Sequence, residues 1–140
     1  EKARLVIGID SSPRMIEEAR KRFGGRGDGV DLRLGEIEHV PVGDNEADVA
    51  VAVMAFHHLS APDRGIREAW RVLNQGGILI VSELDKHADE AMRDRFGDRW
   101  LGFEREQVEG WLESAGFSIA EYGRHDLRRL AMNLFVAVKI

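Results

Sequence analysis

The first part of the chain changes from a strand-like to a helix-like pattern of apolar residues. Residues 5–9 form a continuous apolar run, which is typical of a strand covered on both faces in a parallel sheet. The run stops at Asp10. Ser12 then supplies a helix N-cap and Pro13 a first-turn proline, so these residues predict a helix directly after the strand.

The same alternation continues through the rest of the chain. A short alternating strand is expected at residues 30–34, and residues 35–46 contain turn formers without periodicity. The most apolar strand, residues 48–55, runs into Phe56-His57-His58-Leu59. Periodicity predicts helices beyond Pro62 and at residues 88–96 and 105–115, and strands at 78–81, 118–123 and 133–138, of which the last two pair antiparallel.

Strands that alternate with helices predict an α/β fold with a mostly parallel sheet, to which the final hairpin adds an antiparallel edge. Folds of this kind bind ligands at the carboxyl ends of their strands. We therefore expect polar residues from four strands to gather at one rim: Asp10, Glu36, the turn 54–58 and residues 82–85.

Composition narrows the class of protein. With 140 residues, the chain has room for one domain, residues 1–140, and its formal charge of −5 argues against direct binding of nucleic acid. It contains no cysteine, which removes disulfides and thiolate metal sites. Apolar stretches such as residues 50–56 fall far short of the roughly 20 residues of a membrane span, so we expect a cytoplasmic protein.

Motifs along the chain follow one another in a recognisable order. They lie at residues 6–20, 34–41, 48–59, 71–79 and, in three further pieces, 83–87, 97–103 and 111–117. Together they resemble the class I S-adenosylmethionine-dependent methyltransferase domain, which has a Rossmann-like fold. The later pieces are most similar to the methyltransferase half of bacterial proteins in which this domain follows an ArsR-type winged-helix regulator.

The resemblance implies a role for several residues at the predicted rim. Asp10 would hold the ribose of S-adenosylmethionine, although an acid at this position also suits a simple cap of the next helix. The other cofactor contacts implied are Ser11 and Met15 near the adenine or ribose, Glu36 and Ile37 at the adenine, and Val53 and Met54 beneath the methyl group. The family usually has aspartate where Glu36 stands, which shifts the carboxylate by one methylene.

The two histidines are the candidate catalytic residues. By the resemblance, His57 and His58 would lie near the acceptor pocket, and a base is needed only when the acceptor carries a proton. A neutral imidazole at His57, His58 or His87 has a suitable pKa for that task. Neighbouring residues of a strand point to opposite faces and rarely bind one ion, so we expect no metal.

The largest departure from the family is at the amino end. The first strand and helix of the fold, with the glycine-rich turn that approaches the methionine part of the cofactor, have no counterpart here. Residues 24–29 are rich in glycine, but they follow a helix and precede a strand, the reverse of the required context. The absent strand would lie between the strands that end at Asp10 and Met54, and its loss would leave costly unpaired backbone there. We therefore expect either a fragment, or another chain or a rearranged pairing that fills the gap.

Three functions fit these observations to different degrees. The first is an S-adenosylmethionine-dependent methyltransferase that acts on a small-molecule acceptor. The second, favoured by the absent glycine turn, is a catalytically silent module that forms a homodimer through exposed sheet edges. The third, a nicotinamide-dependent dehydrogenase, shares the acid at Asp10 but fits the His-His-Leu strand ending and the closing hairpin poorly.

Overall fold

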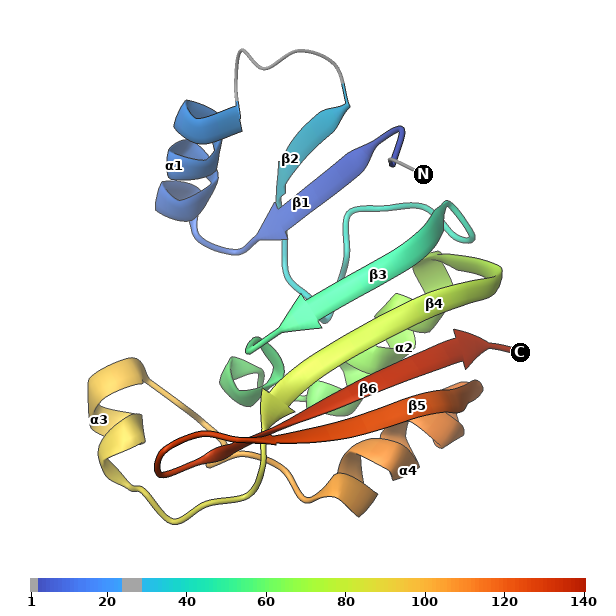
Figure 1. Cartoon of the computed structure of the whole chain (residues 1–140). Helices are drawn as coiled ribbons and strands as arrows, with labels where there is room; N and C mark the ends of the chain where they lie inside the picture. The colour runs from blue at the N-terminus through green and yellow to red at the C-terminus, as the bar shows by residue number, and fades with distance from the viewer. Residues whose placement is uncertain (1–2, 24–28) are drawn as a thin grey trace.

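The computed structural model describes residues 3–23 and 29–140 of the chain (Figure 1). It contains two β-sheets with helices packed beside them, as expected for an α/β fold. The glycine-rich turn discussed above lies at residues 24–29, of which only Gly29 belongs to the described residues. In the described part of the chain, no helix is long and apolar enough to cross a membrane.

The smaller sheet has two parallel strands, β1 (Val6–Asp10) and β2 (Val30–Leu34), joined through helix α1 (Pro13–Phe23). The cap predicted for α1 is present, because the Ser12 hydroxyl accepts a hydrogen bond from the Met15 amide at 3.3 Å.

The larger sheet has four strands in the order β3-β4-β6-β5. Strands β3 (Ala47–Val53) and β4 (Leu73–Leu84) are parallel, while β6 (Ala131–Lys139) runs antiparallel to both β4 and β5 (Phe117–Asp126). The predicted closing hairpin is therefore confirmed. The remaining elements are the 3₁₀ turn η1 (Phe56–His58) and helices α2 (Pro62–Val72), α3 (Ala91–Phe96) and α4 (Arg105–Ala115).

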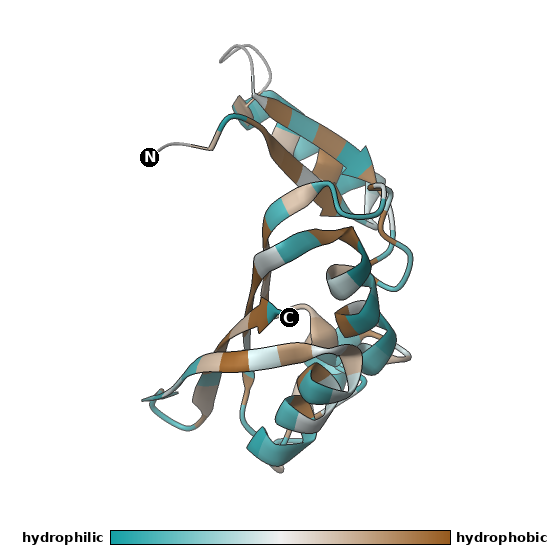
Figure 2. Ribbon diagram, turned by 90° about the vertical axis from the view of Figure 1, so that its right-hand side faces the viewer, coloured by the Kyte–Doolittle hydropathy of each residue, from teal (hydrophilic) through white to brown (hydrophobic). Residues whose placement is uncertain are grey.

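The core lies between the larger sheet and its helices. Helices α2 and α4 lie on one side of this sheet (Figures 1 and 2). The central core residues include Ile66 of α2, Leu112 of α4 and Phe135 of β6, each at most 1% exposed. Along β3, the alanines at positions 50 and 52 pack toward this core, while Val49, Val51 and Val53 are 52–63% exposed. One face of the sheet is thus well covered and the other carries apolar residues in contact with solvent.

The expectation that residues 5–9 are covered on both faces is wrong. Leu5 and Val6 are 56% and 51% exposed, and α1 is the helix that packs on this two-stranded sheet. Its buried residue is Ile16. A continuous apolar run indicates a strand but leaves open which neighbours cover it.

The two sheets do not pair with each other. Within the described residues, β1 pairs with β2 and β3 pairs with β4, so each has one edge without a strand partner. These edges face each other, and the arrowheads of β1 and β3 point the same way (Figure 1). Among the described residues no rearranged pairing fills the gap left by the family's first strand, and a fragment or a second chain stays a prediction.

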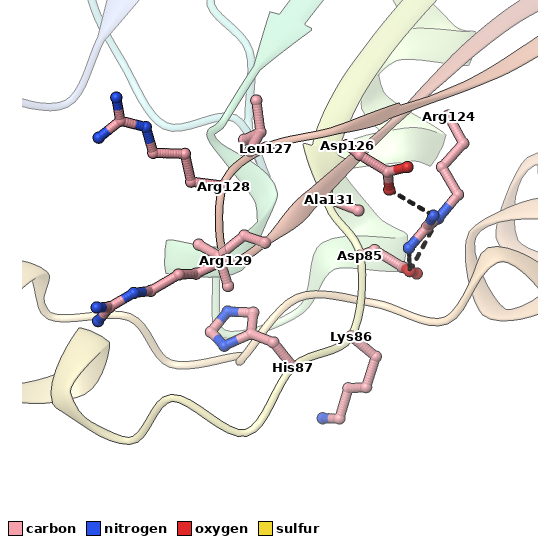
Figure 3. A pocket seen from close by; sticks show the side chains of 10 residues that line it. Asp85, Lys86, His87, Arg124, Asp126, Leu127, Arg128, Arg129 and Ala131 are labelled. Atoms are coloured by element: carbon pink, nitrogen blue, oxygen red, sulfur yellow. Dashed lines mark hydrogen bonds and ion pairs between the residues drawn. The ribbon is translucent and has the colours of Figure 1, made fainter.

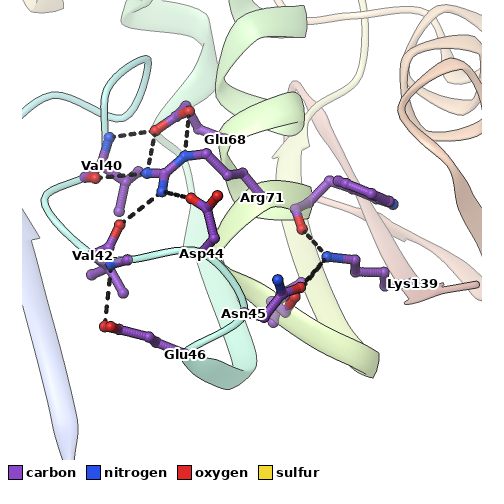
Figure 4. Close-up of polar contacts among 11 residues, drawn as sticks. Val40, Val42, Asp44, Asn45, Glu46, Glu68, Arg71 and Lys139 are labelled. Carbon is purple, nitrogen blue, oxygen red and sulfur yellow. Dashed lines mark hydrogen bonds and ion pairs between the residues drawn. The ribbon is translucent and has the colours of Figure 1, made fainter.

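A network of ion pairs holds the loop between β2 and β3 against α2 (Figure 4). The Arg71 guanidinium donates to the Glu68 and Asp44 carboxylates and to the backbone carbonyls of Val40 and Val42, at 2.7–2.9 Å. The Glu68 carboxylate in turn accepts the Val40 amide at 2.8 Å. The loop that carries two predicted adenine contacts is therefore fixed by charge and not by regular secondary structure.

Candidate functional site

The carboxyl end of β1 brings Asp10 to the rim of the smaller sheet. Its Oδ1 atom accepts a hydrogen bond from the Ser12 amide at 2.8 Å. Asp10 therefore makes the capping contact that was one of its two expected roles. Among the described residues, nothing donates to Oδ2. One carboxylate oxygen therefore remains available for a ligand hydroxyl, and the two interpretations of Asp10 are compatible.

The other predicted cofactor residues differ in how much they are exposed. Ser11, Met15 and Glu36 are exposed, Met15 to 55%. Ile37 instead packs against the core, and a Cβ placed on Gly65 would lie 2.9 Å from its Cγ2 atom. Ile37 thus anchors its loop on helix α2 through a contact that only glycine at position 65 permits.

Strand β3 ends in an unusual backbone conformation. Met54 has a φ of 52°, in the left-handed region that non-glycine residues rarely occupy, and its amide bonds to the Ser82 carbonyl at 2.8 Å. The conformation turns the chain sharply into η1. Val53, one residue earlier, is 58% exposed at the unpaired edge of the sheet. Strain at the end of a strand is typical of functional sites.

The prediction that the two histidines point to opposite faces is wrong. They belong to the 3₁₀ turn η1, not to a strand, and their ring centroids lie 4.1 Å apart. His57 is buried and its Nδ1 atom lies 2.7 Å from Glu83 Oε2, while His58 is 45% exposed. The turn therefore places one imidazole inside the protein and the other at its surface, side by side.

Two buried acids surround His57. Burial acts to lower the pKa of His57, but the hydrogen bond and charge of Glu83, together with the charge of Asp98, outweigh burial and raise this pKa above the usual 6.5. Asp98 Oδ1 lies 3.7 Å from His57 Nε2 and 3.9 Å from His58 Nδ1. This corner of the site thus favours positive charge.

The segment that carries Asp98 is attached directly to η1. The amides of Arg99 and Trp100 both donate to the His57 carbonyl, at 3.0 and 3.1 Å, and the Trp100 indole donates to the Leu59 carbonyl at 3.0 Å. The segment then runs back beside the end of β4, where Phe103 pairs with Asp85. Only glycine fits at position 102, since its φ is 66° and a Cβ there would collide with the Asp85 carbonyl.

Sequence reasoning placed Glu83 at the rim, within residues 82–85, but gave it no role, and it missed Asp98. An acid close to the end of an otherwise apolar strand is an anomaly that marks Glu83. Asp98 follows Gly97 in an irregular segment, and no periodic pattern distinguishes it from the exposed acids around it. Only the tertiary structure, which folds the segment 97–103 over η1, shows that it is buried.

A shallow pocket of about 320 Å³ lies beyond the carboxyl end of β4 (Figure 3). Asp85 lies in its wall and is held by Arg124 at 3.2 Å and by Asn133 at 3.0 Å. His87 Nδ1 accepts the Asp89 amide at 3.2 Å, while its buried Nε2 atom has no partner among the described residues. With Nδ1 as acceptor, Nε2 carries the proton and is an unused donor.

Comparison with known proteins connects this geometry to a family. The family model described as "Methyltransferase domain" matches residues 1–81. An uncharacterized 37.1 kDa protein in a transposon of Streptomyces fradiae is 40% identical over 80 residues, covering 57% of this chain and 23% of that protein. The 2-methyl-6-phytyl-1,4-hydroquinone methyltransferase 1 of Oryza sativa is 33% identical over 114 residues, covering 80% and 33%. The chain thus spans between a quarter and a third of the length of these relatives.

A solved structure supports the fold. The [4+2]-cyclase SpnF superposes with a TM-score of 0.84 at 24% identity, over 99% of this chain and 67% of that one. The elements of this chain are therefore those of the Rossmann-like class I methyltransferase fold, with a mostly parallel sheet and a carboxyl-terminal hairpin. Since that neighbour is described as a cyclase, the fold by itself does not show which reaction is catalysed.

Proposed function

Because the chain belongs to the family of S-adenosylmethionine-dependent methyltransferase domains, we propose that it takes part in methyl transfer from S-adenosylmethionine to a small-molecule acceptor. The observation that carries the proposal is the rim formed by Asp10, Glu36 and Met54, at which the ordered family motifs coincide with the carboxyl ends of parallel strands. The cofactor of this family is S-adenosylmethionine.

The described residues fit the adenosine part of this cofactor. Asp10 offers a carboxylate oxygen without a partner, suited to a ribose hydroxyl, and the exposed Ser11 and Met15 border it at the start of α1. Glu36 and Ile37 would take the adenine, on a loop held in place by Arg71. In the family fold, a glycine-rich turn after the first strand contacts the methionine part of the cofactor, and no described residue takes that place. The edges of β1 and β3 that would flank this strand are unpaired.

We place Val53 and Met54 beneath the methyl group of the cofactor and the two histidines of η1 on the acceptor side. Methyl transfer to a nucleophile proceeds by in-line displacement, in which positioning contributes most, and a base is needed only for a protonated acceptor. His58 is the accessible imidazole for this task, and His57 positions the turn through Glu83. The pocket at Asp85 and His87 would hold the rest of the acceptor, with the His87 Nε2 proton as a donor.

Calorimetric titration with S-adenosylmethionine tests the proposal. We expect micromolar binding that Asp10→Ala weakens at least about ten-fold, the effect of losing a charge-assisted hydrogen bond. Asp94→Ala, which removes an exposed acid of α3, is the matched control and should bind like the unmodified chain. No binding at millimolar cofactor would exclude an enzyme that works as this chain alone.

A second candidate function rests on the unpaired edges of β1 and β3. Val49, Val51 and Val53 expose an apolar stripe beside one such edge, and exposed strand edges of this kind associate readily. The chain would then be a catalytically silent module that dimerises. Sedimentation of the chain with and without Val51→Lys separates the two functions, because a dimer that this change dissociates, combined with absent cofactor binding, supports the module.

A further inference from the structure

We infer that His57, His58 and Asp98 form a binding site for one divalent transition-metal ion, of which Zn²⁺ is the reference. The nearest ligand atoms of these three residues all lie within 4.8 Å of one another. They come from two segments far apart in the sequence, η1 and the irregular segment after α3, which the His57 carbonyl joins by two hydrogen bonds. The site shares His57 and His58 with the proposed acceptor side, but its test measures metal binding and does not depend on methyl transfer.

Asp98 is the first observation that indicates a cation. Its side chain is 1% exposed, and neither carboxylate oxygen accepts a hydrogen bond from any described residue. Burial of a carboxylate without a partner is costly, so native proteins pair such groups with a cation or a metal ion. The basic side chains that approach Asp98 Oδ1 in the described structure are His57 and His58, both beyond hydrogen-bonding distance.

The state of His57 is the second observation. Because Nδ1 lies 2.7 Å from Glu83 Oε2, Nε2 is the ring nitrogen left to face another partner. Nε2 lies 3.7 Å from Asp98 Oδ1, too far for a hydrogen bond but close enough for both atoms to bind one ion. A carboxylate on the far nitrogen is also the usual partner of a metal-binding histidine, since it fixes the tautomer and strengthens the ligand.

The distances are close to those of a bound ion. Metal bonds of about 2.0–2.1 Å place tetrahedral ligand atoms about 3.4 Å apart. Asp98 Oδ1 lies 3.7 Å from His57 Nε2 and 3.9 Å from His58 Nδ1, and all three ligand atoms lie within 4.8 Å of one another. The partly exposed His58 ring is the ligand with most freedom to adjust toward the other two. Three protein ligands also leave one position open toward solvent, as in catalytic rather than structural zinc sites.

The ligand set selects the class of ion. Two imidazoles and one carboxylate suit zinc, iron, cobalt and nickel, whereas magnesium and calcium prefer oxygen ligands alone. The chain has no cysteine, so no thiolate competes for a soft metal. We therefore expect Zn²⁺ and Co²⁺ to bind and Mg²⁺ not to bind.

Titration of the chelator-treated chain with Zn²⁺ tests the site. The expected result is one ion per chain with micromolar or tighter affinity, and no heat with Mg²⁺. His58→Ala should weaken binding at least 100-fold, and it is the key variant because a half-exposed side chain contributes little to folding. His125→Ala removes an exposed histidine of β5 and is the matched control. Glu83→Gln should weaken binding about 10–100-fold through His57.

Co²⁺ supplies a second readout. The visible absorption of bound Co²⁺ reports nitrogen and oxygen ligands in a low-symmetry site, and it should disappear in Asp98→Asn while the circular dichroism of the variant stays unchanged. Zn²⁺ binding weaker than about 100 μM, or binding that His58→Ala leaves intact, would overturn the inference. Equal loss in His125→Ala would do the same, because it would indicate unspecific binding to surface histidines.

Discussion

The two sheets of this protein have similar apolar strands but very different degrees of burial. In the four-stranded sheet, Leu79 of β4 and Phe135 of β6 are at most 1% exposed, because α2 and α4 cover one face and these two strands have a strand partner on both sides. In the two-stranded sheet, Ile7 and Ile9 are only half-buried, and α1 contributes Ile16 as its buried residue. The difference teaches that an apolar strand is buried by its neighbours, so the two regions should differ sharply in stability.

The largest expected effect comes from creating a cavity in the core between the four-stranded sheet and its helices. Leu112→Ala removes a side chain of α4 that is 0% exposed and should lower the free energy of unfolding by about 2–5 kcal/mol. Leu5→Ala, at a site 56% exposed beside β1, should change it by less than about 0.5 kcal/mol. Urea unfolding followed by circular dichroism measures both. Equal losses would contradict the proposed difference between the regions.

The second largest effect is expected at Lys139, a buried lysine of the four-stranded sheet. Lys139 is 3% exposed, and its ammonium donates to Asn45 Oδ1 and to the carbonyls of Trp70 and Leu73, each at 2.8 Å (Figure 4). It also lies 3.8 Å from the centre of the Trp70 ring. Since it satisfies carbonyls at the carboxyl end of α2, Lys139→Ala should cost about 2–3 kcal/mol.

The control for this prediction is Lys86→Ala, which removes an exposed lysine at the pocket rim. Thermal unfolding of the two variants should show a clear drop in Tm for the first and almost none for the second. A drop of the same size in both would mean that loss of positive charge, and not loss of the bonds at the end of α2, causes the effect.

A pH-dependent contribution of about 1 kcal/mol is expected from the loop that joins the two regions. The hydrogen bond from Arg71 lowers the pKa of Glu68 below the usual 4.5, although burial opposes it, and the Val40 amide lowers it further. A depressed pKa in the folded state stabilises the protein above the unfolded pKa, and this stabilisation is lost as the pH falls through the folded value.

Glu68→Gln should therefore be less stable than the unmodified chain at about pH 7, and the gap should narrow in acid below about pH 4. Urea unfolding at both pH values measures it. Glu113→Gln, on the exposed side of α4, is the matched control and should show no such dependence. A gap that stays constant with pH would show that the change acts through packing alone.

Sequence reasoning succeeded where local patterns determine the structure. Helix α4 was predicted at its observed bounds, because an apolar stripe ends there at Gly116, whose φ of 100° closes the helix. The predicted helix 88–96 is shorter in the structure, where α3 begins at Ala91. The strand expected at 78–81 extends over Leu73–Leu84, since its pairing with β3 begins before the glycines.

The candidate site was harder to predict, because it depends on contacts between distant segments. Asp10 and Met54 were placed at the ends of their strands correctly, since strand ends follow from the apolar pattern. The histidines were placed in the turn 54–58 but were treated as neighbours on a strand when a shared ion was considered, whereas the positive φ of Met54 turns them into η1. Asp98 comes to His57 only through tertiary folding, which no spacing in the sequence reveals. Their roles in binding or catalysis remain predictions.

The smallest expected effect concerns helix α1, which packs on the two-stranded sheet. Ser12→Ala removes the hydroxyl that accepts the Met15 amide and should weaken α1 by about 0.5–1 kcal/mol. Hydrogen exchange should accelerate in α1 and leave the amides of β4 and β6 unchanged, because α1 packs on β1 and β2 and has no core in common with the larger sheet. Ser118→Ala, an exposed serine of β5, is the control. If exchange accelerated in both sheets together, the two regions would unfold as one cooperative unit, and the contrast in their burial would not translate into a contrast in stability.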